Sequence, residues 1–342
     1  TLVSPAIAVG SDRLGEHRRV AIVLGWASLA ALLVLTQSSG FWPILLCVLA
    51  FALAWTSIMP LAETLAMGVV RSIAADYGRM RLWGSVSFIV ASVAGGWWIE
   101  HTSAAAAIWL IALAAFTTAV IGHQLPAASE LGNGGSAAAA TRADALALMR
   151  SPPFLWFVMA VGAVQAAHAV FYVFGVLHWR AQGLSTAWCG GLWALSIVVE
   201  IALLAYSSAV LRLVSPVTLI LAGAVASVVR WSAMGFDPPF WLLVPLQITH
   251  ALTFAASHLG AVHFLARTVA PESAATAQAL YSAAAGGIAM GGAMMLAGPA
   301  YAAYGGKAYW SMTVLSLAGV GATLIVRRRS AALGPQASRP LA

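Results

Sequence analysis

Long apolar stretches, separated by short polar or Gly/Pro-containing breaks, run along almost the whole chain. Ten of them have about the length that a helix needs to cross the ~30 Å hydrocarbon core of a bilayer. They lie at roughly residues 20–36, 43–68, 82–99, 105–124, 154–177, 187–210, 216–234, 240–266, 276–302 and 308–326. A shorter apolar stub, residues 1–10, precedes them. The pattern predicts an all-helical, polytopic membrane protein.

The composition supports this class. Hydrophobic residues make up 61% of the 342 residues and charged residues only 8%, with a mean hydropathy of +0.90, which is far from the values of a soluble domain. The net charge of +7 does not indicate nucleic-acid binding, because the arginines lie in short loops between apolar stretches. The two cysteines, Cys47 and Cys189, lack the spacing of a metal site or a disulfide framework. We therefore expect no metal and no cofactor.

The charges of the loops predict an orientation in the membrane. Of the 17 Lys and Arg residues, 14 fall in alternate connections and in the C-terminal tail, which the positive-inside rule places in the cytoplasm. These regions are residues 11–19, 69–81, 125–150, 211–215, 267–275 and the tail from 327. We expect a multi-pass protein whose longest loop and C-terminal tail are both cytoplasmic.

The longest loop also suggests the domain organisation. It is rich in Gly and Ala, which is typical of a flexible linker, and its last part, Arg142–Arg150, is expected to form a short amphipathic helix. We predict an incomplete N-terminal helical half at 1–124, the linker at 125–150, a C-terminal six-helix half at 151–330 and a tail at 331–342. In a transporter built from two six-helix halves, this count implies that the chain is N-terminally truncated, without the first helix and most of the second.

One short loop carries a recognisable motif. The sequence SDRLGEHRR (residues 11–19) resembles the loop between the second and third helices of the major facilitator superfamily, although Ala8 stands where that motif has its first Gly. Gly15 permits a tight turn, while Asp12, Arg13 and Arg18 can make charge-assisted contacts with neighbouring helix ends that hold one conformation closed. An ordinary positive-inside loop is the alternative interpretation.

Six further strings resemble one family within that superfamily, the 3-phenylpropionic acid transporters, which are similar to the lactose permease and nucleoside:proton symporter group. They are DYGRMRLWGSVSF (76–88), QAAHAVFY (165–172), LWALSIVVE (192–200), VVRWSAMG (228–235), QITHALTFAASHL (247–259) and LYSAAAGGIAMGG (280–292). The resemblance implies the major facilitator fold and a monomeric symporter that imports protons with a small aromatic carboxylate across the bacterial inner membrane. It also adds Asp76, Arg79 and Arg81 to the expected gating loops.

Three ionisable residues, Glu200, Arg230 and His250, lie inside successive apolar stretches of the second half. A charge at bilayer depth costs several kcal/mol unless it is paired or faces water, so we expect a mutually neutralising cluster beside a polar cavity, with His250 bridging the other two. The resemblance matches them to the corresponding Glu, Arg and His of the lactose permease group. We expect Glu200, with His250 and with Glu63 of the other half, to carry protons. A static Glu200–Arg230 pair is the structural alternative.

Arg230 is also the group expected to hold a substrate carboxylate, since a guanidinium binds a carboxylate in a bidentate manner. Permanent neutralisation of Glu200 is the alternative role. Helical spacing adds other candidates that could line the substrate site, each of which could instead serve helix packing or interhelical hydrogen bonding. They are His168, Gln165, Thr253, Ser257, His258, Trp193 and Tyr281.

Enzyme motifs such as H-E-x-x-H, the P-loop and G-x-S-x-G are absent from the sequence, so we expect no enzyme activity. Two alternatives to an aromatic-acid symporter stay open. The same scaffold serves sugar and nucleoside:proton symporters, and Thr253, Ser257 and Gln165 could bind hydroxyl groups. A membrane sensor that transports nothing would retain Glu200 and Arg230 as a structural pair.

Overall fold

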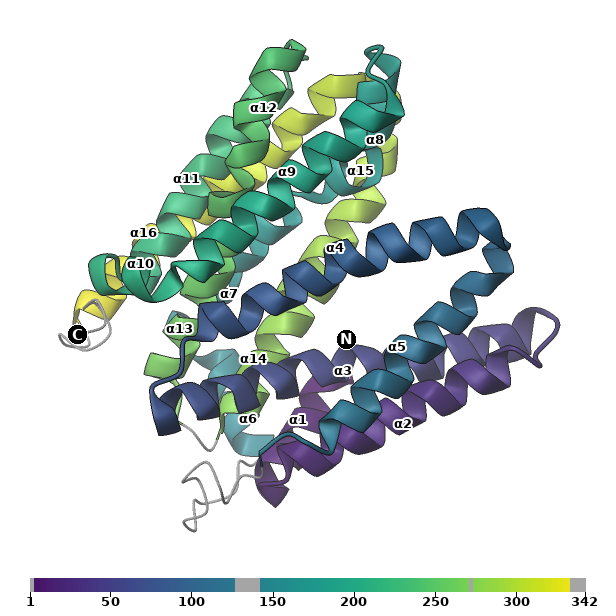
Figure 1. The fold of residues 1–342 in the computed structure, drawn as a ribbon. Coiled ribbons are helices and arrows are strands. Elements are labelled where there is room, and N and C mark those ends of the chain that lie inside the picture. The colour runs from purple at the N-terminus through teal and green to yellow at the C-terminus, as the bar shows by residue number, and fades with distance from the viewer. Residues whose placement is uncertain (1–2, 127–141, 271–272, 333–342) are drawn as a thin grey trace. The chain divides into compact units, whose positions relative to one another are not determined.

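The computed structural model describes residues 3–126, 142–270 and 273–332, and each regular element within these ranges is a helix (Figure 1). The expected all-helical class is therefore confirmed for this part of the chain. Most of the linker expected at 125–150 and nearly all of the tail expected at 331–342 lie outside the described residues. The division of the chain into halves at that linker stays a prediction.

The chain forms two compact units. The first consists of Thr1–Ala75, Val86–Leu148 and Val269–Ala283, and the second of Asp76–Ser85, Met149–Thr268 and Ala284–Ala342. Helix α4 (Tyr77–His101) contributes its first turns to the second unit and the remainder to the first. Each unit thus combines two long segments of the chain with one short segment from elsewhere in the sequence.

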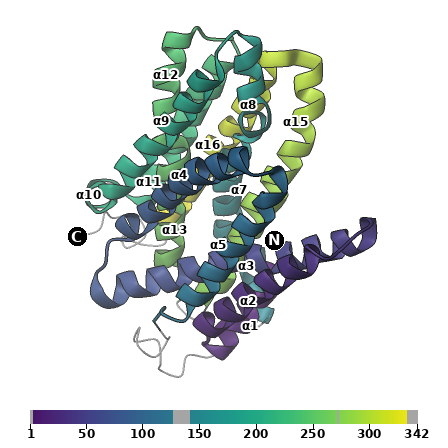
Figure 2. The same ribbon diagram turned by 45° about the vertical axis from the view of Figure 1, so that its right-hand side comes forward.

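In the first unit, helix α2 packs against both α3 and α5, and α14 packs against α1 and α3 (Figures 1 and 2). The apolar contacts between α2, α3 and α5 gather around Leu32, Ala112 and Ala115. The helices of this unit besides α4 are α1 (Ser4–Leu14), α2 (His17–Leu35), α3 (Phe41–Ile73), η1 (Ala104–Ala106), α5 (Ala107–Gly122), α6 (Arg142–Arg150) and α14 (Ala274–Ser282). Helix α6 confirms the short helix expected before the second half.

Two loops are much shorter than the polar pattern suggested. The expected loop 11–19 is reduced to a turn at Gly15 and Glu16, because α1 continues to Leu14 and α2 begins at His17. Gly15 ends α1 in the left-handed conformation at φ +61°, which glycine adopts without a steric penalty. Likewise, α3 reaches Ile73 and α4 begins at Tyr77, so only three residues of the expected loop 69–81 are outside helices.

In the second unit, α11 is the central helix and packs against α16, α13 and η2, while α16 also packs against α7. The approach of α11 to η2 is close at Gly223, where a Cβ atom would lie 2.6 Å from the carbonyl oxygen of Leu252. The helices are α7 (Pro152–Ala166), α8 (Ala169–Ala181), α9 (Thr186–Ala205), α10 (Ser207–Leu213), α11 (Pro216–Met234), α12 (Phe240–Ile248), η2 (Ala251–Ala256), α13 (Ser257–Thr268), η4 (Ala283–Ala289), α15 (Met290–Tyr304), η5 (Gly305–Ala308) and α16 (Tyr309–Ala332).

Several helices of this unit are interrupted within an apolar stretch. The turn at Ala167 and His168 separates α7 from α8, and η2 and η4 are π-helical turns. Pro245 lies inside α12, shortly before η2. A proline has no backbone N–H and disrupts the regular helical hydrogen-bond pattern, and π-helical turns occur often at functional sites. These interruptions bring polar side chains into the interior of the unit.

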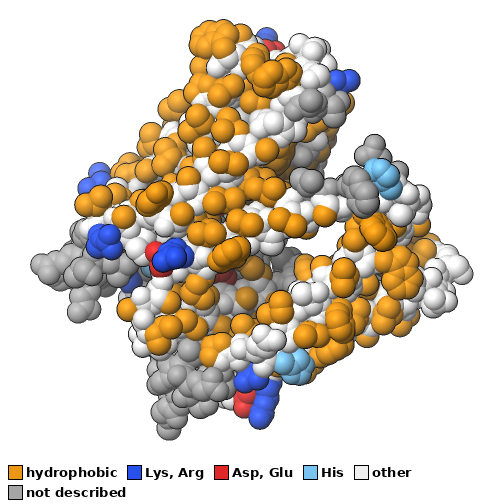
Figure 3. Space-filling model, in the orientation of Figure 1, with side chains coloured by type: hydrophobic (Ala, Val, Ile, Leu, Met, Phe, Trp, Pro, Cys, Tyr) orange, Lys and Arg blue, Asp and Glu red, His pale blue; other side chains and the backbone are white. Residues whose placement is uncertain are grey.

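Large apolar side chains cover much of the surface, as the orange atoms in Figure 3 show. Trp241, Leu213 and Met295 are 71%, 81% and 80% exposed. Seven helical stretches in the described part of the chain are long and apolar enough to cross a bilayer, and a lipid environment would bury such side chains. They are His17–Leu35, Phe41–Ile73, Pro152–Ala181, Trp188–Ala205, Pro216–Met234, Phe240–Thr268 and Ala274–Arg329.

Candidate functional site

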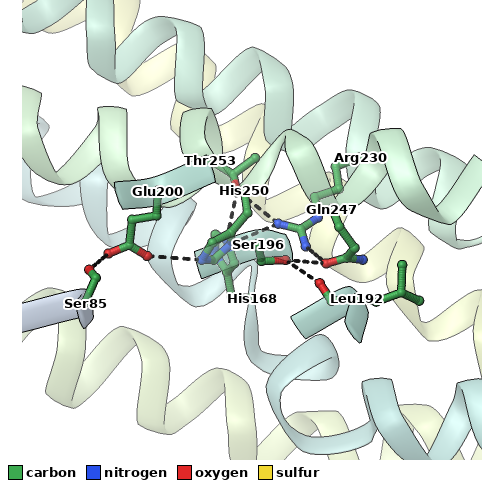
Figure 4. Close-up of polar contacts among 9 residues, drawn as sticks. All are labelled: Ser85, His168, Leu192, Ser196, Glu200, Arg230, Gln247, His250 and Thr253. Atoms are coloured by element: carbon green, nitrogen blue, oxygen red, sulfur yellow. Dashed lines mark hydrogen bonds and ion pairs between the residues drawn. The ribbon is translucent and has the colours of Figure 1, made fainter. Parts of the chain in front are cut away.

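The polar centre of the second unit is Arg230, a fully buried residue on α11 (Figure 4). Its Nη2 atom donates to Oε1 of Gln247 at 2.8 Å, and its Nη1 atom donates to Oγ1 of Thr253 at 3.2 Å and to Nδ1 of His250 at 3.1 Å. All three are neutral acceptors. Within the described ranges, no carboxylate forms an ion pair with Arg230.

The partners of Arg230 define the directions of the surrounding hydrogen bonds. Because a guanidinium only donates, Nδ1 of His250 must accept, and the neutral ring carries its proton on Nε2. Thr253 accepts from Arg230 and can therefore donate its own hydroxyl proton to Nε2 of His168, 3.1 Å away. Nδ1 of His168 then donates to the carbonyl oxygen of Val164 at 3.0 Å. Both imidazole rings thus have one defined tautomer.

Glu200 lies on α9, beyond His250. Its Oε1 atom accepts a hydrogen bond from Oγ of Ser85 at 2.7 Å, and its Oε2 atom lies 3.8 Å from Nε2 of His250. The latter separation is too long for a hydrogen bond. The imidazole therefore separates the carboxylate from the guanidinium, with its protonated nitrogen facing Glu200 and its lone pair facing Arg230 (Figure 4).

Aromatic rings form the apolar wall around the guanidinium. The Cζ atom of Arg230 lies 4.9 Å from the ring centroid of Phe171 and 4.6 Å from that of Trp231. Phe171 stacks on Trp193, and Trp231 stacks on Tyr309. Such cation–π contacts contribute about 0.5–2 kcal/mol each and do not neutralise the charge.

The local fold explains how these groups converge. Gln247, His250 and Thr253 lie on α12, at the start of η2 and within it, where the change from α- to π-helix alters the side-chain period. His168 lies at the break between α7 and α8, where its ring can bond to Val164 of the preceding turn. The helical interruptions therefore lie in the two chain segments that bring Gln247, His250, Thr253 and His168 to the Arg230 cluster.

Two residues expected on the same polar face as His250 lie elsewhere. Ser257 is fully buried against α11, with its hydroxyl 3.4 Å from the carbonyl oxygen of Leu252. His258 contacts the hydroxyl of Tyr77 at 3.2 Å. The expected face assumed a regular α-helix, and the π-helical turn η2 interrupts that periodicity.

The remaining expected substrate and proton residues fall in both units. In the second unit, Gln165 is buried in the last turn of α7, and Trp193 stacks on Phe171. In the first unit, Glu63 is buried on α3 shortly after Pro60, and Tyr281 is buried on α14. Each unit thus contributes buried polar or aromatic side chains to the expected set.

The motif residue Asp12 contacts the start of a helix that is distant in sequence. Its carboxylate accepts hydrogen bonds from the backbone N–H groups of Ala275 and Thr276, at 3.3 and 2.7 Å, and from the hydroxyl of Thr276. His17 donates to the same carboxylate at 2.9 Å. Asp12 thereby supplies acceptors to the first turn of α14, where a negative charge is stabilising.

Asp76 forms a second contact of this kind inside the other unit. Its carboxylate accepts from the hydroxyls of Ser207 and Ser208 at 2.8 and 2.6 Å, and from the backbone N–H of Arg79 at 3.2 Å. Burial by itself raises the pKa of Asp76, but these hydrogen bonds and one from the Gly78 amide outweigh it and hold the pKa below its ordinary value. The contact ties the start of α4 to α10.

The other residues of the expected gating loops make more local contacts. Arg18 donates to the carbonyl oxygen of His123, at the end of α5. Arg81 follows Arg79 by two residues in the first turns of α4, with its guanidinium close to Gly84. Arg13 occupies the last turn of α1, directly before the turn at Gly15.

Three residues of the Arg230 cluster were not predicted from the sequence: Gln247, Ser196 and Ser85. Gln247 precedes His250 by three residues, so helical periodicity alone would have placed both on one face. Ser196 precedes Glu200 by four residues and donates to Gln247 at 2.8 Å. Ser85 contacts Glu200 across helices, and no sequence signal connects them. In the described part of the chain, no three His, Cys, Asp or Glu side chains are grouped so as to hold a metal ion.

Sequence comparisons relate almost the whole chain to membrane transporters. Residues 1–312 match the profile of the MFS_1 like family. The chain is 31% identical over 299 residues to the Probable 3-phenylpropionic acid transporter of Escherichia coli (strain K12), covering 84% of this chain and 76% of that protein. It is 28% identical over 287 residues to the Maltose permease of Geobacillus stearothermophilus, covering 82% and 71%.

Solved structures show the same fold at low sequence identity. A bacterial homologue of the iron transporter ferroportin, in an outward-facing state, matches with a TM-score of 0.69 and 16% identity, covering 96% of this chain and 87% of that one. The fucose:proton symporter FucP of E. coli matches with a TM-score of 0.68 and 14% identity, covering 96% of this chain and 87% of that one. The nucleoside transporter NupG matches with a TM-score of 0.62 and 16% identity, covering 95% of this chain and 86% of that one.

The Asp76 contact generates a prediction about stability and pH. The pKa of the Asp76 carboxyl is lower in the folded than in the unfolded protein. Asp76 therefore contributes fully to the free energy of unfolding above the unfolded pKa, and this contribution is lost as the pH falls through the folded pKa. Asp76→Asn should therefore lower the melting temperature in detergent at neutral pH, and the difference from wild type should shrink at about pH 3. Melting curves across this range test it. A difference that stays constant with pH would show that the carboxylate charge is not responsible.

Proposed function

This chain belongs to the MFS_1 like family and is a secondary transporter of the major facilitator superfamily, not an enzyme, and we propose that it imports a small aromatic carboxylate together with a proton. A phenylpropionate-like acid is the substrate class. We further propose that the protein works as a monomer by alternating access in the bacterial inner membrane, with its linker and C-terminal tail in the cytoplasm. The family assignment rests on the comparisons, whereas substrate and coupling are argued from the site.

The observation that carries the proposal is the surroundings of Arg230. Among the described residues, the fully buried guanidinium hydrogen-bonds only to neutral groups, and it lies against the rings of Phe171 and Trp231. A substrate carboxylate can contact the guanidinium directly, which Glu200 does not, and an aromatic substrate ring fits among side chains of the same chemistry. The E. coli relative, named for 3-phenylpropionic acid, supports the same class.

Charge balance couples the binding of the substrate anion to the protonation of Glu200. With Glu200 ionised, the cluster of Glu200, neutral His250 and Arg230 has no net charge. A bound substrate anion makes the buried cluster negative by one, and protonation of Glu200 restores neutrality. Each event therefore makes the other more favourable, because an uncompensated buried charge costs several kcal/mol. His250 lies between the substrate-binding Arg230 and the proton-binding Glu200. Its Nδ1 atom is 3.1 Å from Nη1 of Arg230 and its Nε2 atom is 3.8 Å from Oε2 of Glu200, so the two groups interact through this ring.

The other buried residues complete the proposal. We assign Glu63 to the proton route of the first half, and His168, Gln165, Thr253, Trp193 and Tyr281 to substrate contacts. Ser257 and His258 lie away from Arg230 and are not assigned to these contacts. Asp12, Arg13, Gly15 and Arg18, with Asp76, Arg79 and Arg81, are assigned to gating. The support for gating is that Asp12 and Asp76 each bond to a helix end that is distant in sequence. Such bonds can form in one transport state and break in the other.

A sugar or nucleoside substrate is the second candidate. The relatives named for maltose, fucose and nucleosides favour it, and Thr253 and Gln165 offer hydroxyl-binding groups. A sensor that transports nothing is the third. Uptake of labelled solute into proteoliposomes under an imposed pH gradient separates the sensor from both transporters.

We predict that Glu200→Gln abolishes proton-driven accumulation but retains exchange of substrate between the two sides. The neutral isostere fills the same space and keeps the hydrogen bond with Ser85, but it cannot take up and release a proton. Accumulation under a pH gradient and counterflow exchange, measured on the same proteoliposomes, test this. Undiminished uphill uptake by the variant would refute the proton role of Glu200.

We predict that Arg230→Lys weakens binding of 3-phenylpropionate by about tenfold or more, because an ammonium group cannot form two parallel hydrogen bonds with a carboxylate. An uncharged sugar or nucleoside should be affected less. Arg180→Lys is the control, since Arg180 is exposed and donates only to a nearby carbonyl oxygen in its own segment. Unchanged affinity for each acid tested would rule out a carboxylate clamp at Arg230.

A further inference from the structure

Gln247 is the closest neutral partner of the buried guanidinium. Its Oε1 atom accepts from Nη2 of Arg230 and from Oγ of Ser196, both at 2.8 Å. Since the guanidinium can only donate, the oxygen of the amide faces Arg230 and the NH₂ group faces away. That Nε2 atom is fully buried and has no hydrogen-bond partner among the residues the structure describes.

A glutamate at this position would have nearly the same size and shape. It would keep the contacts of Oε1 with Arg230 and Ser196, and it would lose no bond of the NH₂ group, because that group has none within the described chain. The main change would be electrostatic. A carboxylate in direct contact with Arg230 would form a buried ion pair and neutralise the guanidinium.

Among the described residues, none neutralises the guanidinium by direct contact. Thr253 and His250 are neutral acceptors, and Glu200 is separated from Arg230 by the imidazole ring of His250. Nε of Arg230 is likewise buried and without a described partner. The hydrogen bonds of Nη1 and Nη2 thus fix the position of the guanidinium. Its positive charge and its Nε–H group can still interact with a substrate anion.

We propose that Gln247 determines the charge selectivity of the transporter. The neutral amide oxygen positions Arg230 without compensating its charge, so the guanidinium can bind an anionic substrate. A carboxylate at the same position would pair with the guanidinium and exclude substrate anions. This inference rests on the proposed binding of an aromatic carboxylate. Gln247 would thus determine specificity through its contact with Arg230. Its NH₂ group, which has no partner in the described chain, can donate a hydrogen bond to the same substrate.

The test compares two probes that differ in charge, 3-phenylpropionate and its neutral analogue 3-phenylpropionamide, by calorimetric titration of the purified full chain in detergent. Gln247→Glu should weaken binding of the acid by about tenfold or more and change binding of the amide by less than about threefold. Gln247→Met, which removes the hydrogen bond without adding charge, should leave the preference for the acid over the amide in place. Equal loss for both probes in Gln247→Glu would overturn the proposal.

Thermal unfolding without any substrate gives an independent measurement. In a Glu200→Gln background, where no other carboxylate of the described chain balances Arg230, Gln247→Glu should raise the melting temperature because the guanidinium gains a counter-charge, whereas Gln247→Met should lower it. A Gln247→Glu protein that aggregates, or melts as low as the Met variant, would overturn the proposal.

The two hypotheses fail in different ways. Wild-type protein that binds neither probe contradicts the proposed substrate class, and the melting comparison still decides whether Gln247 leaves Arg230 uncompensated. Wild-type protein that prefers the acid, with an unchanged preference in Gln247→Glu, supports the proposed function and contradicts the role of Gln247.

Discussion

A buried guanidinium that no carboxylate of the described chain contacts is the constraint on which the polar centre of the second unit depends. Removing a guanidinium from water costs several kcal/mol, even after the surroundings relax. Hydrogen bonds to Gln247, His250 and Thr253 satisfy part of its polar surface, and the rings of Phe171 and Trp231 stabilise its charge without neutralising it. Arg230 is therefore held in a defined position by neutral groups, as the proposed binding of a substrate anion requires.

Two helical irregularities lie at this cluster. Arg230 contacts Gln247, His250 and Thr253, which follow one another at intervals of three residues and so lie near one face of their segment. The π-helical turn η2 begins directly after His250 and changes the period for the residues beyond it. The turn at His168 between α7 and α8 brings a further ring to the same cluster. The absence of a side chain at Gly223 allows α11 to approach η2 closely.

The sequence predicts the fold class well because membrane helices need long apolar stretches, and these are visible in a single chain. It predicts loop lengths poorly, since polar residues such as those at 11–14 can extend a helix until a residue like Gly15 ends it. The cost of burying charge likewise indicated Glu200, Arg230 and His250.

Side-chain partners between helices were harder to foresee. The contact of Ser85 with Glu200 joins segments 115 residues apart, and it depends on packing that no local pattern contains. Ser257 and His258 were assigned to the polar face by a regular period that the π-helical turn breaks. Gln247 was missed for another reason. Burying an uncharged amide costs much less free energy than burying a charge, so a glutamine in an apolar stretch does not stand out in the sequence.

The central claim is that anion binding at Arg230 and protonation of Glu200 favour each other. The direct measurement is the number of protons taken up when 3-phenylpropionate is added to the purified protein in a weakly buffered solution near neutral pH, followed with a pH indicator. The account predicts an uptake of about one proton for each anion bound, and none in a Glu200→Gln protein that still binds the acid. Binding of the acid to the wild-type protein without proton uptake, or the same uptake in the variant, would contradict it.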